Sequence, residues 1–182
     1  MALLLDKLLA TKEDFNDFRS ISKNIATEKI DIFIRESQLI EIRAFLGSTI
    51  YLQLQEDYDE NTKTFGNPIF NSLWFGVDYI NKKQEEVRFN GYMNSLVYFA
   101  YGRFLLQQQM NVSRFGLESL QDTISEDTPL AQVKTKAKEA LSMAIQYQED
   151  CVKFIEVHAT DYPTFKTKES KGKNTSFTFF RV

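Results

Sequence analysis

The sequence predicts an all-α protein, a helical bundle of about four to five helices with a small β-hairpin or extended loop and an extended C-terminal tail. Three observations predict it. Apolar residues recur at helical spacing, capping residues and glycines bound those stretches, and the last long stretch carries a heptad-like seam. The expected domains are a helical domain over residues 1–162 and a basic tail over residues 163–182.

The N-terminal part is expected to hold a short helix and then a long one. Thr11 can cap the first helix, and acidic residues occupy its first turn. Thr27 is the expected cap of the second helix, and Gly47 its stop. The apolar residues of this long helix form two neighbouring stripes: Ile32, Leu39, Ile42 and Leu46; and Ile30, Phe33, Ile34 and Ile40.

Those two stripes are wider together than one core face requires. The helix is therefore either nearly surrounded by its own domain or also in contact with a neighbouring subunit. The second alternative makes four residues candidates for a subunit interface: Ile32, Phe33, Leu39 and Ile42.

The middle of the chain is expected to alternate short elements with loops. Helices are predicted over residues 49–56 and 68–75, separated by a polar loop, and a β-hairpin or extended loop over residues 77–90. Residues 91–110 are apolar nearly all round, as in a helix at the centre of a bundle, and Arg103 is expected to extend to solvent at its end.

The last helix is predicted from Thr128 and Pro129 to about Val157. Its apolar residues recur at alternating steps of four and three, and its alanines allow a close approach to another helix. The seam consists of Val133, Ala137, Ala140, Ala144, Tyr147, Cys151 and Phe154.

Charge divides the chain unevenly. Of the net charge of −3, the residues from Pro163 onward contribute +4, so residues 1–162 carry −7. An acidic body with a basic tail suggests that the tail docks on a negative surface, although a solvated tail is also common. The ending SFTFFRV alternates like a strand that needs a partner. The candidate partner-binding residues are Phe165, Lys166, Lys168, Lys171, Lys173, Phe177, Phe179, Phe180 and Arg181.

Composition limits the remaining functional classes. The aromatic content of 14% fits either a Phe-rich core or contacts with other chains. One cysteine excludes an internal disulfide, and charges at Asp6 and Lys7 interrupt the apolar N-terminal stretch, which indicates neither a signal peptide nor a membrane span.

No catalytic constellation is recognisable. Cys151 and His158 lie two helical turns apart, too far for a nucleophile pair, and they cannot supply the four ligands of a zinc site. Acidic pairs in predicted loops suit solubility better than metal binding, and the glycines form no phosphate-binding loop. We therefore expect no enzyme, no metal and no cofactor.

The order of several short motifs resembles the head–tail connector (neck adaptor) proteins of tailed bacteriophages, in the form found in crAss-like and other Bacteroidetes phages. The resemblance covers residues 10–165. It rests on AFLG at 44–47 with Ile50, Tyr51 and Leu54; LWFG at 73–76 with Tyr79; FNG at 89–91; YGRF at 101–104; FGL at 115–117 with Ser125 and Glu126; and DYP at 161–163.

The resemblance implies a structural virion protein made in the bacterial host cytoplasm. Such subunits form a homo-oligomeric ring, commonly twelve-fold, that docks on the portal protein and carries the next neck or tail protein. Genomic DNA passes through the channel without sequence-specific binding, and no membrane is involved. Three alternatives stay open: another ring such as a tail-completion protein, a non-viral helical scaffold module, and an enzyme with an unfamiliar carboxylate site.

Deleting residues 164–182 is expected to leave the fold intact and to weaken docking, because the tail differs from the body in charge and carries an unpaired strand pattern. Circular dichroism and a portal-binding assay measure the two effects. A loss of helical signal on truncation would contradict the first.

Overall fold

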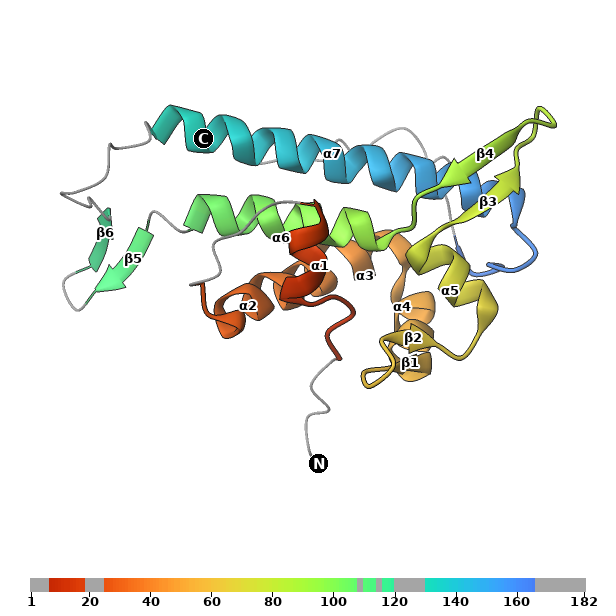
Figure 1. The fold of residues 1–182 in the computed structure, drawn as a ribbon, viewed down its shortest axis with the longest axis horizontal. Coiled ribbons are helices and arrows are strands. Elements are labelled where there is room, and N and C mark those ends of the chain that lie inside the picture. Colours follow the sequence, from red (N-terminus) through yellow and green to blue (C-terminus); the bar gives the residue numbers. More distant parts are fainter. Residues whose placement is uncertain (1–6, 19–24, 108–109, 114–115, 120–129, 166–182) are drawn as a thin grey trace.

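The structure, a computed structural model, describes residues 7–18, 25–107, 110–113, 116–119 and 130–165 (Figure 1). Its N-terminal half contains α1 (Lys12–Phe18), α2 (Thr27–Ser37), the π-helix η1 (Gln38–Ile42), α3 (Arg43–Leu46) and α4 (Ser48–Asp57). The remaining helices are α5 (Pro68–Phe75), α6 (Met93–Gln107) and α7 (Leu130–Val157).

The prediction of an all-α fold is wrong, because the described residues also form three two-stranded antiparallel sheets. The pairs are β1 (Tyr58–Asp59) with β2 (Thr64–Phe65), β3 (Val77–Ile80) with β4 (Glu86–Phe89), and β5 (Met110–Ser113) with β6 (Gly116–Ser119). The fold is mixed but mostly helical. The β3–β4 pair lies within residues 77–90, where a hairpin or extended loop was predicted, whereas the other two pairs are short runs that were not predicted as strands.

Helices α6 and α7 form the long axis of the molecule, lying antiparallel and side by side (Figure 1). The predicted seam of α7 faces inward, with its alanines and Cys151 buried. Gly102 brings the backbones close, because a Cβ atom there would lie 3.1 Å from Leu141. The hydroxyl of Ser95 donates a hydrogen bond to the carbonyl oxygen of Ala144 at 3.0 Å, which fixes the register of the two helices.

The β3–β4 hairpin lies beside the C-terminal end of α7 (Figure 1). Its base depends on two glycines with positive φ, Gly76 and Gly91, where the chain leaves α5 and approaches α6. A Cβ atom on Gly76 would lie 2.2 Å from the Phe89 carbonyl oxygen, and one on Gly91 would lie 2.4 Å from that of Trp74. The two connections can therefore cross only as glycine backbone.

The long helix predicted to end before Gly47 is interrupted by the π-turn of η1. Within it the backbone N–H of Arg43 donates to the carbonyl oxygen of Gln38, an i→i+5 bond. A π-turn holds an extra residue, so the side chains after it are rotated about the helix axis relative to an uninterrupted α-helix. The expected cap also differs, since Ala26 occupies the N-cap position of α2 and no side chain caps it.

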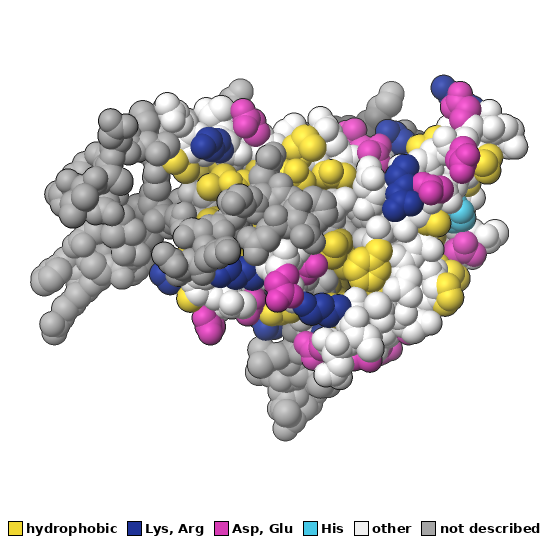
Figure 2. Space-filling view, viewed as in Figure 1, with side chains coloured by type: hydrophobic (Ala, Val, Ile, Leu, Met, Phe, Trp, Pro, Cys, Tyr) yellow, Lys and Arg dark blue, Asp and Glu magenta, His cyan; other side chains and the backbone are white. Residues whose placement is uncertain are grey.

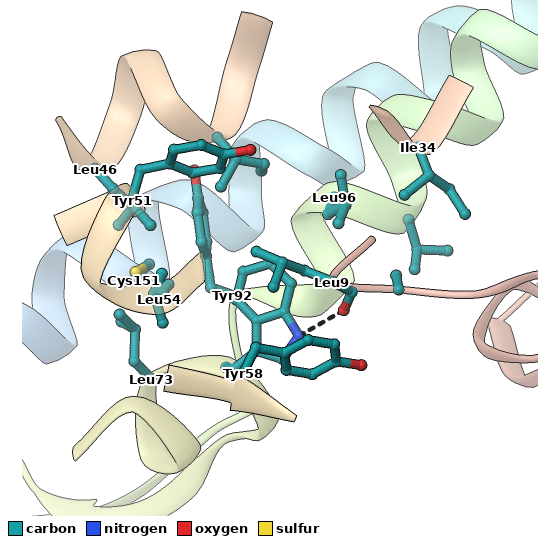
Figure 3. Close-up of a cluster of buried hydrophobic side chains, with 14 of the residues drawn as sticks. Leu9, Ile34, Leu46, Tyr51, Leu54, Tyr58, Leu73, Tyr92, Leu96 and Cys151 are labelled. Carbon is teal, nitrogen blue, oxygen red and sulfur yellow. Dashed lines mark hydrogen bonds between the residues drawn. The ribbon is translucent and has the colours of Figure 1, made fainter. Parts of the chain in front are cut away.

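A short N-terminal segment, residues 7–10, runs through the core beside these helices without entering a helix or sheet. Its backbone is held by side chains from three elements. The Gln38 amide accepts from Leu9 N–H at 2.8 Å and donates to the Lys7 carbonyl oxygen at 2.9 Å. The Trp74 indole donates to the Leu9 carbonyl oxygen at 3.1 Å, drawn as the dashed line in Figure 3.

This arrangement satisfies backbone groups that would otherwise be buried without partners. Gln55 adds a fourth bond, donating to the Lys7 carbonyl oxygen at 3.1 Å. Leu9 is buried in the main apolar cluster, and Figure 3 shows it among Tyr92, Leu96 and Tyr58. We call residues 7–10 the clamped segment. The boundary at residue 163 stays a prediction, and residues 166–182 of the tail lie outside the described residues.

Replacing Ala144 with Trp is expected to destabilise the protein by about 1–3 kcal/mol or more, because α6 leaves no space at the seam. The melting temperature should fall by about 2–4 °C for each kcal/mol. Gln146→Trp, at an exposed position of the same helix, is the control. An equal melting temperature for the two variants would show that Ala144 does not lie in a packed seam.

Replacing Gln38 with Met keeps a similar shape but removes both bonds to the clamped segment, leaving the Leu9 N–H buried without a partner. The expected loss is about 1–3 kcal/mol in the free energy of unfolding, measured by urea titration. Gln53→Met, at an exposed site on α4, is the matched control. Indistinguishable urea midpoints for the two variants are the outcome that contradicts a role for the Gln38 amide.

Candidate assembly interface

Exposed apolar side chains gather on the helix formed by α2 and η1. Ile32 is 55% exposed, Leu39 is 41% exposed and Ile40 is 54% exposed. Scattered single apolar residues are ordinary on protein surfaces, but here three exposed ones lie within nine positions of one helix, and two of them line the same hollow. We call Ile32, Leu39 and Ile40 the exposed helix face.

A shallow hollow of about 310 Å³ lies on this face, with Ile32 and Leu39 among its lining residues. Its other lining residues are charged: Glu28, Asp31, Arg35 and Glu36. Burial raises the pKa of the Asp31 carboxyl, and the nearby Glu28 charge raises it further, while Arg35 opposes the shift. Apolar and charged side chains therefore occur together on this face, as they do in protein–protein contacts.

An ion-pair network attaches this helix to α6. The Arg103 guanidinium hydrogen bonds to Glu41 of η1 and lies 3.8 Å from a carboxylate oxygen of Glu36. Arg103 was expected to extend to solvent at the end of the helix. It is instead partly buried and paired, because a guanidinium in such a place requires a partner of opposite charge. Beside it, Phe33 packs edge-to-face on Phe104, with ring centroids 5.8 Å apart.

The Glu41 carboxyl is the least compensated group of this network. Burial raises its pKa, and the hydrogen bond and positive charge of Arg103 reduce that shift without reversing it. Its second oxygen, Oε2, is buried with no hydrogen-bond partner among the described residues. The network therefore fixes the helix while leaving one buried acceptor unsatisfied.

Two of the four predicted interface residues are placed where a neighbour could reach them. Ile32 and Leu39 are exposed, Phe33 is half-buried against α6, and Ile42 is fully buried in the main core. Ile42 is therefore wrong as an interface residue. The π-turn between Leu39 and Ile42 rotates Ile42 inward, whereas sequence spacing had placed both on one stripe.

Of the predicted partner-binding residues, only Phe165 lies within the described part of the chain. Its ring packs against Phe45 of α3 with centroids 5.5 Å apart, so the start of the tail belongs to the folded body. Lys166, Lys168, Lys171, Lys173, Phe177, Phe179, Phe180 and Arg181 lie outside the described residues.

The two residues considered for nucleophilic chemistry are placed in aromatic packing. Cys151 is buried, and burial raises the pKa of its thiol well above the ordinary range. His158 contacts the rings of Phe154 and Tyr79, and its Nδ1 lies 3.0 Å from the Phe154 carbonyl oxygen. Within the described ranges, no three His, Cys, Asp or Glu residues are grouped to hold a metal ion. Nor does any helix there have the length and apolar content to cross a membrane.

Sequence reasoning missed a second concave surface. A groove of about 520 Å³ lies between α4, the start of α5 and the chain that follows α7. Its acidic lining residues, Glu56, Asp57 and Asp161, come from parts of the sequence that are far apart. A cluster of carboxylates assembled from distant segments leaves no local pattern to read.

Figure 2 views the molecule along the direction used in Figure 1, with apolar side chains visible on the described surface among acidic and basic ones. Comparison with family models matches residues 42–175 to a family of unknown function, DUF6712. No curated protein and no solved structure matches the chain.

The unfolding free energy of the natural protein, relative to Glu41→Gln, is expected to fall as pH rises from about 4.5. An acid whose pKa is raised in the folded state holds its proton more tightly there. Deprotonation between the ordinary pKa of 4.5 and the raised pKa then destabilises the folded state. Urea titrations of both proteins between about pH 4 and 7 measure this difference. A constant difference, or one of opposite slope, would show that Arg103 fully compensates the carboxylate.

Proposed function

The chain belongs to a family of unknown function, DUF6712, and we propose that within a tailed bacteriophage it forms a neck ring that docks on the portal, extends the DNA channel and links capsid to tail. The observation that carries the proposal is the exposed helix face. Ile32, Leu39 and Ile40 present apolar surface on a helix that its own domain holds firmly, so a neighbouring subunit is the natural cover.

The shape of the subunit also supports a place in a layered assembly. Helices α6 and α7 run the length of the molecule, with one hairpin near each end (Figure 1). A two-stranded hairpin has two unpaired edges, to which strands of other proteins can add. Such a subunit can contact lateral neighbours along its sides and other components at its ends.

Charge supports the same role. Residues 1–162 carry −7 of the net charge, so a channel lined by this body repels the phosphate backbone. DNA that must slide through a channel requires a wall to which it does not adhere. The basic residues are concentrated after Pro163, where the proposal assigns them to a protein partner.

Co-expression with the portal protein of the same genome tests this function. A ring seated on the portal in electron micrographs is expected. Replacing Ile32 and Leu39 with Lys should abolish the ring while leaving the melting temperature within about 2 °C, because the substituted side chains are exposed. A portal without a ring, with all partners folded, would contradict the portal-binding role.

The matched control is Leu52→Lys, because Leu52 is 52% exposed but lies on α4, outside the exposed helix face and both concave surfaces. This variant should still form the ring laterally. If the control fails as completely as the double variant, any added charge disrupts the assembly, and the exposed helix face has no special role.

A further inference from the structure

The groove between α4, α5 and the chain after α7 is a built surface, because hydrogen bonds join its three walls. The Tyr162 hydroxyl donates to the Ile69 carbonyl oxygen at 2.9 Å, which attaches the chain after α7 to α5. Asp57 at the end of α4 accepts from the Asn67 N–H at 2.8 Å, and the Asn67 side chain caps α5. The walls are therefore held together without an added partner.

The lining of this groove has a definite chemistry. Ile50, Ile69 and Phe70 contribute apolar surface. Glu56, Asp57 and Asp161 contribute carboxylates, and no Lys or Arg is among its described lining residues. The ammonium of Lys7 hydrogen bonds to the carbonyl oxygens of Glu56 and Tyr58 but is not part of the lining. A ligand that fits must carry positive charge and apolar groups together.

The chain itself contains a segment of that chemistry. Residues 166–182 hold five basic residues against Glu169, and three phenylalanines follow the lysines, at positions 177, 179 and 180. A volume of about 520 Å³ lies within the range of about 300–1,000 Å³ typical of ligand sites, enough for a short stretch of peptide.

We propose that this acidic groove binds the basic tail, residues 166–182, of a second copy of the chain. Thr164 is part of the groove wall, but the next residue, Phe165, packs on Phe45, which does not line the groove. Phe165 therefore holds the start of the tail outside the groove, and a tail that enters the groove of its own copy must turn back past Phe165. A neighbour's tail enters without that reversal.

The tail has the length for such an exchange. Residues 166–182 span roughly 55 Å when extended, at about 3.3 Å per residue. The inference rests on the self-assembly in the proposed function, because tails exchanged between copies link neighbours around a ring. It does not depend on which particle contains the ring.

Photo-crosslinking of the full chain tests the exchange. Benzoylphenylalanine replaces Phe177, and equal amounts of ¹⁴N and ¹⁵N protein are mixed, alone at high concentration and again with the portal. Crosslinks are expected from position 177 to residues 53–57, 67–70 or 161–164, joining one light and one heavy chain. The same probe at Gln146, an exposed site on α7, is the control for random contact.

Three outcomes overturn the proposal: crosslinks only within one isotope, which place the tail in its own groove; crosslinks to other surfaces or to the portal; and no mixed crosslinks in either sample. Mixed crosslinks without a ring on the portal support the exchange and count against the neck function. A portal-bound ring whose tails crosslink to the portal would contradict the exchange and support the neck function.

A charge swap gives a second measurement. Glu56→Lys with Asp161→Lys should lower the mixed-crosslink yield about tenfold, the effect of about two surface ion pairs. Combining these with Lys166→Glu and Lys168→Glu should restore most of that yield. Glu139→Lys, on an exposed position of α7, should leave the yield unchanged. Failure of the combined variant to recover any yield, with its helical signal intact, overturns the electrostatic part of the proposal.

Discussion

The clamped segment is the constraint on which the rest of the structure depends. Residues 7–10 pass from a half-buried start into the core, where their backbone amide and carbonyl groups have no sheet partner. Gln38, Gln55 and Trp74 supply the missing hydrogen bonds from three different elements. Those elements can therefore pack together only around residues 7–10, and the apolar cluster closes over Leu9.

The hydrogen bonds that the clamped segment requires also affect the surface proposed for assembly. Gln38 is the first residue of the π-turn, and its amide is directed inward to the clamped segment. The extra residue in that turn directs Ile42 into the core, while Leu39 and Ile40 stay outside. The π-turn thus supplies hydrogen bonds to the clamped segment and also separates the buried Ile42 from the exposed Leu39 and Ile40. A π-turn at a functional surface is a recurrent association in proteins.

The two concave surfaces lend themselves to different contacts. The exposed helix face offers apolar side chains with charged ones beside them, which suits lateral packing of rigid bodies. The groove beside α5 is lined by acidic and apolar side chains, which suits an extended basic peptide. A ring built from both contacts would combine rigid packing with exchanged tails. Loss of the helix-face contact and loss of the tail contact would each weaken the ring, and variants of one surface would leave the other intact.

The sequence by itself determined the helices with regular periods and clear ends. The buried seam of α7, the apolar α6 and the stops at Gly47 and Gly76 follow from spacing and backbone freedom, which are local properties. Tertiary structure alone decided the π-turn, the pairing of Arg103 with Glu41, the burial of Ile42 and the acidic groove. Each of these depends on groups distant in the chain, such as Gln38 with Leu9, whose contact gains free energy only after the intervening helices have folded.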